Sequence, residues 1–98
     1  MNKLVLAEIG KELADELESL SEKFHVKSDH HEILLWEVHI IKVRVKDLIE
    51  NSGIQNKLLK ESVLVSQWGD SLSLIPNEII TKVKDFHSNY NELKNPNL

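Results

Sequence analysis

The stretch from Ile33 to Ile49, ILLWEVHIIKVRVKDLI, constrains the fold more than any other, because eleven of its seventeen residues are apolar. Any core that this chain forms must run through it. Read as a helix, the stretch has two apolar faces on roughly opposite sides of its axis. The first face comprises Leu34, Val38, Ile41, Val45, Leu48 and Ile49. The second face comprises Ile33, Trp36, Ile40 and Val43.

Charged and polar residues separate these two faces. Glu37 and Arg44 lie on one flank, and the other flank is formed by His39, Lys42, Lys46 and Glu50. A helix with two apolar faces is expected to pack on both sides. We therefore expect the first face to enter the core, and the second either to enter the same core or to form an interface with a partner.

A β-strand is the alternative for this stretch. Trp36, Val38 and Ile40 alternate with polar residues, and the many β-branched residues over 36–46 favour a strand. However, a strand would need a bulge at residues 40–41 and would be unusually long, whereas a helix accounts for every apolar residue. The helix is the preferred prediction.

The N-terminal segment predicts an amphipathic helix over residues 3–24. Its apolar stripe consists of Leu6, Leu13, Leu17, Leu20 and Phe24. Gly10 occupies the position of a further member of the stripe. Glycine costs a helix about 1 kcal/mol relative to alanine, so the helix could be broken at this residue. The opposite face is acidic, with Glu8, Glu12, Asp15, Glu16, Glu18 and Glu22.

Boundary residues divide the rest of the chain. Ser28 or Asp29 is suited to the N-cap of the central helix, and Gly53 to its end. A third helix is predicted over 54–68, with a hairpin over 62–75 as its rival. Pro76 marks the start of a last helix over 77–93.

The predicted fold class is all-α, an antiparallel up-and-down bundle of about four helices. It forms a single domain over residues 1–94, followed by a frayed tail at 95–98. The alternative is an α+β fold, in which strands from 36–46 and 62–75 form a small antiparallel sheet packed by the first and last helices.

Composition argues against several classes of function. The absence of cysteine excludes disulfide and thiolate chemistry and suits a cytoplasmic protein. No segment approaches a membrane span, and the formal charge of −4 makes nucleic acid an improbable partner. Three scattered glycines cannot form a phosphate-binding loop, and no catalytic motif occurs. We therefore expect no enzymatic activity and no cofactor.

The five histidines do not form a metal-binding pattern. Metal sites on helices need ligands about one turn apart, and only the pair Glu22 and His25 has that spacing. A second pair on another helix is missing, so no metal site is predicted. His39 and Lys42 are similar to the H-x-x-K-G motif of histidine phosphotransfer domains, but Val43 stands where that family has glycine.

Two segments resemble families that bind DNA. Residues 68–76, WGDSLSLIP, resemble the W-G-N-S-L-x-x-R-I-P strand of swapped-hairpin antitoxins and AbrB-type regulators, but they are one residue short and lack the arginine. The N-terminal half resembles a ribbon-helix-helix repressor with residues 3–7 as the strand. In that register Val5 and Ala7 would face the bases, and neither can form a hydrogen bond to a base edge.

These resemblances imply an alternative function, a small DNA-binding transcriptional regulator or antitoxin with Lys42, Arg44 and Lys46 as its basic patch. The preferred prediction is a non-enzymatic protein-binding module, such as a small bacterial or phage inhibitor, immunity protein or adaptor, whose partner is another protein or a second copy in a homodimer. The candidate contact residues are Glu8, Glu12, Asp15, Glu16, Glu22, Ile33, Trp36, Ile40 and Val43.

Overall fold

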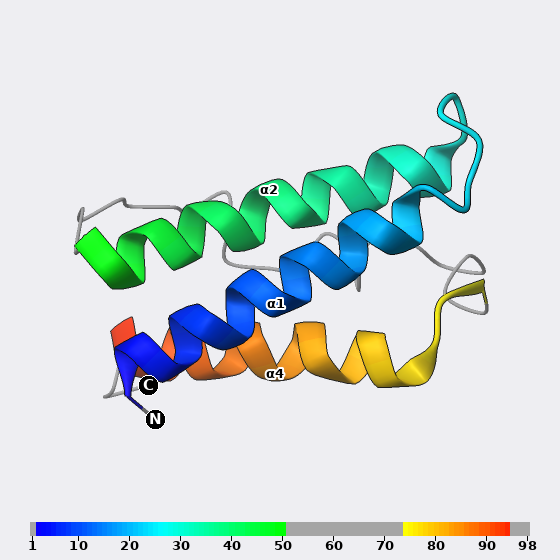
Figure 1. The fold of residues 1–98 in the computed structure, drawn as a ribbon. Coiled ribbons are helices and arrows are strands. Elements are labelled where there is room, and N and C mark those ends of the chain that lie inside the picture. The colour runs from blue at the N-terminus through cyan, green and yellow to red at the C-terminus, as the bar shows by residue number, and fades with distance from the viewer. Residues whose placement is uncertain (1, 51–73, 95–98) are drawn as a thin grey trace.

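The computed structural model describes residues 2–50 and 74–94, and these ranges contain three α-helices (Figure 1). The helices are α1 (Lys3–Ser21), α2 (Asp29–Glu50) and α4 (Asn77–Lys94). The central stretch is helical from end to end, so the alternative strand over 36–46 is wrong. The predicted helix over 54–68 and nearly all of the alternative strand over 62–75 lie outside the described residues.

α1 packs against both α2 and α4. Figure 1 shows α1 between the other two helices, with its chain direction opposite to both of them. Whether a fourth helix completes a bundle stays a prediction.

Local hydrogen bonds explain where α1 and α2 begin. The side chain of Asn2 accepts a hydrogen bond of 2.7 Å from the amide of Leu4, which makes Asn2 the N-cap of α1. The hydroxyl of Ser28 accepts a hydrogen bond of 3.2 Å from the amide of His31. Of the two candidates for the N-cap of α2, the geometry selects Ser28 rather than Asp29.

The hydrophobic core lies where the three helices meet. The predicted stripe of α1 is buried, and Phe24, which follows the helix, packs partly buried against the core. The first face of α2 is buried except for Ile49, which is 47 % exposed because it lies in the last turn. α4 contributes mainly Val83, Phe86 and Tyr90.

Gly10 lies where side chains of both α2 and α4 come close to α1, and α1 continues through it without a break. A Cβ atom at this position would lie 2.5 Å from Cγ2 of Val45 on α2 and 2.6 Å from Cε1 of Phe86 on α4. Real Cβ atoms do not come so near to other carbons. Side chains of α2 and α4 therefore occupy the space that a side chain at position 10 would take.

We expect Gly10→Ala to destabilise the protein by about 1–2 kcal/mol, although alanine is the better helix former. Val45 is β-branched and Phe86 is buried, so neither side chain can move aside freely. Chemical unfolding followed by circular dichroism measures the change. Ser19→Ala, at an exposed position of the same helix, is the control and should cause no loss. A Gly10→Ala variant as stable as the wild type would contradict the close approach.

Candidate functional site

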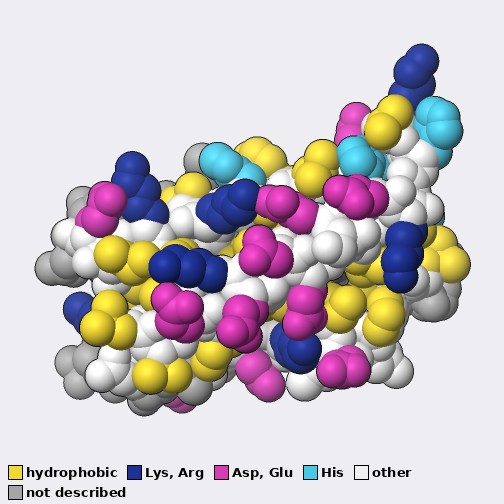
Figure 2. Space-filling view, viewed as in Figure 1, with side chains coloured by type: hydrophobic (Ala, Val, Ile, Leu, Met, Phe, Trp, Pro, Cys, Tyr) yellow, Lys and Arg dark blue, Asp and Glu magenta, His cyan; other side chains and the backbone are white. Residues whose placement is uncertain are grey.

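The candidate contact residues of α1 form one exposed surface, the acidic face, which consists of Glu8, Glu12, Asp15, Glu16 and Glu22. Each of them is exposed because the opposite side of the same helix is buried in the core. Figure 2 shows acidic side chains gathered along the middle of this side of the molecule, over α1. The structure thus places these five predicted residues together.

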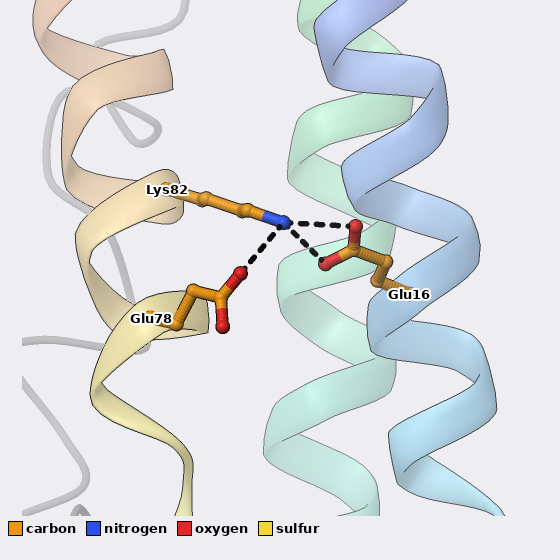
Figure 3. A network of polar contacts seen from close by, with 3 residues as sticks. All are labelled: Glu16, Glu78 and Lys82. Carbon is orange, nitrogen blue, oxygen red and sulfur yellow. Dashed lines mark hydrogen bonds and ion pairs between the residues drawn. The ribbon is translucent and has the colours of Figure 1, made fainter.

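Two lysines from the neighbouring helices reach the acidic residues of α1. Lys42 of α2 forms an ion pair of 2.5 Å with Glu18, and Lys82 of α4 forms one of 3.0 Å with Glu16. Lys82 also lies 3.6 Å from Glu78, so that it stands between two carboxylates (Figure 3). The hydrogen bonds that Lys42 donates to Glu18 and Lys82 donates to Glu16 raise the pKa values of both lysines above the ordinary value.

A shallow groove of about 380 Å³ runs between the C-terminal half of α1 and the start of α4. Residues of both helices and of the segment before α4 line it: Asp15, Glu16, Ser19, Leu20, Lys23, Pro76 and Ile79. Hydrophobic side chains come to the surface beside the acidic ones on this side of the molecule (Figure 2). Part of the acidic face therefore borders a hollow with apolar lining.

The second apolar face of α2 is divided by the structure. Ile40 is fully buried, whereas Ile33 and Val43 are partly buried. Trp36 is 49 % exposed, with its ring 5.4 Å from that of His39. Of these four candidate contact residues, Trp36 presents the most apolar surface to a partner.

The three cations that would form a DNA-binding patch do not share one surface. Arg44 is only 1 % exposed, so its guanidinium cannot reach a phosphate. Lys42 is held by Glu18, and Lys46 is exposed. Non-specific DNA binding requires several accessible cations. This geometry gives the DNA-binding alternative little support.

Charged and polar side chains are buried between α2 and α4, and we call them the polar cluster. Its members are Glu37, Arg44 and Asp47 of α2, and His87, Tyr90 and Lys94 of α4. Glu37 is 0 % exposed and Asp47 is 1 % exposed. The flank of α2 that carries Glu37 and Arg44 is thus enclosed. Only the opposite flank, with Lys42 and Lys46, reaches solvent.

His87 connects two charged residues of α2. Arg44 Nη1 lies 2.5 Å from His87 Nδ1, and His87 Nε2 lies 2.5 Å from Glu37 Oε1. An arginine can only donate, so Nδ1 accepts and the proton of a neutral ring is on Nε2, from which it is donated to Glu37. The imidazole therefore links a cation to an anion across the interface of the two helices.

Asp47 forms the second centre of the polar cluster. Its Oδ2 accepts a hydrogen bond of 2.7 Å from the hydroxyl of Tyr90 and lies 2.8 Å from Nζ of Lys94. The guanidinium of Arg44 stacks 4.7 Å from the centre of the Tyr90 ring, which joins the two centres. Burial lowers the pKa of Arg44. Burial and the hydrogen bond to Asp47 together raise the pKa of Tyr90.

The polar cluster links α2 and α4 in the interior of the protein. Glu37 and Arg44 have almost no accessible surface, so a substrate could not contact them in this conformation. The sequence contained one signal of the cluster. Glu37 and Arg44 occupy the arc of α2 between two apolar faces, and such an arc can be enclosed when both faces pack.

A search against protein-family models, curated proteins and solved structures found no match to this chain. Among the residues that the structure describes, no helix is long and apolar enough to cross a membrane. In the same residues no three His, Asp or Glu side chains are arranged to hold a metal ion. Function must therefore be inferred from the surfaces described above.

Replacing Arg44 tests the polar cluster. Arg44→Met removes a buried cation that contacts His87 and Tyr90, and we expect a loss of about 3–5 kcal/mol in the free energy of unfolding. The control Lys46→Met changes an exposed lysine two residues away, and it should alter stability by less than about 0.5 kcal/mol. Chemical denaturation compares the two variants, and equal losses would mean that Arg44 is not held as described.

Tyr90 is the only tyrosine of the chain, so its ionisation can be followed by ultraviolet absorbance. We expect its phenolate to form in the folded protein only well above pH 10.0, its ordinary pKa, and near that value in denaturant. Because the unfolded chain loses this proton first, stability should be complete below pH 10.0 and fall as the pH rises towards the folded pKa. A folded-state titration that coincides with the denatured one would contradict the burial of Tyr90.

Proposed function

We propose that this chain is a non-enzymatic protein-binding module that binds a basic protein partner through the acidic face of α1. The observation that carries the proposal is that α1 and Glu22, the residue after it, present five exposed acidic side chains while the other side of the helix forms the core. Such a face is held on a rigid element. Electrostatic complementarity of this kind speeds association and selects partners of the opposite charge.

Three residues of the acidic face are suited to a test: Glu12, Asp15 and Glu22. Glu12 and Asp15 lie on α1, and Glu22 directly follows it. Bound partners would contact them together with Glu8 and Glu16. Trp36 of α2 is the candidate for an additional apolar contact, including one with a second copy of the chain. Inhibitors, immunity proteins and adaptors are the functional types to which such a module would belong.

The test is affinity capture from an extract of the source cells, with a charge-reversed variant as comparison. Glu12→Lys, Asp15→Lys and Glu22→Lys are combined in one protein. The wild type should retain a basic protein at low salt, and the variant should bind it at least about tenfold more weakly.

The matched control carries the same change of charge elsewhere, as Glu32→Lys, Asp85→Lys and Glu92→Lys, all at exposed positions of α2 and α4. It should retain the partner. Equal retention by the two triple variants would show that the acidic face is not the contact surface. Loss of the partner from both would show only a dependence on net charge, which also contradicts the proposal.

A further inference from the structure

We propose that the groove between α1 and α4 receives a peptide segment of the partner in which a Lys or Arg side chain lies next to an apolar side chain. This inference rests on the proposed function and names the contact point within it. The groove borders the acidic face at Asp15 and Glu16 and has an apolar lining that comes from both helices.

The lining of the groove fits one apolar side chain. Leu20 is buried, Ile79 is partly buried and Pro76 is exposed, so aliphatic surface is open to solvent between the two helices. Removing such surface from water is favourable when a complementary apolar group covers it. The volume of about 380 Å³ is at the lower end of ligand pockets, and the shallow form suits a side chain on a peptide better than an enclosed small molecule.

The charges around the groove select a cation and fix where it lies. Glu16 and Asp15 form the wall on α1, and Glu78 stands on the opposite side at the start of α4. Lys82 meets both Glu16 oxygens, at 3.0 and 3.2 Å, and shows that an ammonium group fits against this wall (Figure 3). Lys23 lines the groove as well, and it disfavours a second cation near it.

Lys82 therefore competes with the partner for the same carboxylate. Its side chain is about half exposed and its ion pairs are accessible to solvent, so a stronger ligand can displace it at small cost. Removal of the lysine should leave Glu16 open to the partner's cation. A substitution that removes Lys82 is therefore expected to improve binding of the partner.

The probe is a short capped peptide in which an Arg-Lys pair is flanked by leucines, titrated into the 98-residue chain labelled with ¹⁵N. We expect saturable shifts of the amide signals of Ser19, Leu20, Lys23 and Ile79, all of which line the groove. A peptide with glutamates in place of the Arg-Lys pair should cause no such shifts. A peptide with alanines in place of the leucines should bind several-fold more weakly.

Matched variants of the protein then separate the contributions. Lys82→Gln should bind the Arg-Lys peptide about threefold more tightly, and Lys84→Gln, at an exposed position of the same helix, should leave affinity unchanged. Asp15→Asn should weaken binding about threefold, whereas Asp85→Asn, at an exposed position of α4 outside the groove, should have little effect.

The outcomes distinguish this inference from the proposed function. Shifts confined to residues near Glu8 and Glu12, or no saturable shift in an experiment where the acidic face still captures its partner, would overturn the groove and leave the proposed function standing. Unchanged affinity in both Lys82→Gln and Asp15→Asn would also overturn it. Failure of the charge-reversal comparison would remove the proposed function itself.

Discussion

α2 and α4 are linked by a set of buried charged and polar side chains that must all be paired at once. Removing Glu37, Arg44 and Asp47 from water costs several kcal/mol for each ion, and only well-placed partners offset this cost. His87 and Tyr90 supply those partners from α4. A shift of one helix along the other would separate several pairs together. The polar cluster thus restricts the relative position of the two helices more narrowly than apolar contacts alone would, although the buried Nε of Arg44 finds no partner among the described residues.

α1 is held by a different kind of interaction. Its buried side is apolar, and the missing side chain at Gly10 lets Val45 and Phe86 approach its backbone. Lys42 and Lys82 reach over the edges of the same helix to Glu18 and Glu16. A helix fixed by close packing on one side presents its remaining acidic residues in a constant arrangement. Preorganisation of this kind reduces the entropy that a contact surface loses on binding.

The sequence predicted the helices well where apolar residues repeat on one side only. α1 and α4 were expected at 3–24 and 77–93, and the structure has them at Lys3–Ser21 and Asn77–Lys94. It predicted the surroundings of Glu37 and Arg44 poorly, because a charged residue between two apolar faces is compatible with solvent or with burial. His87, which pairs with Glu37 in the interior of the protein, is fifty residues from it in the chain. The acidic face was found from spacing alone, but the groove beside it was not, since Pro76 and Ile79 come from a distant segment.

The sequence by itself determined that α1 and α4 are helices, that one side of α1 is buried, and that its other side is acidic. These properties follow from the period of the apolar residues and from the caps, which act over one or two turns. Only the tertiary structure decided that Gly10 is a point of contact, that Trp36 remains half exposed and that Arg44 is enclosed. The physical reason is that burial of a side chain depends on what a second helix places opposite it, and helical periodicity contains no information about that neighbour.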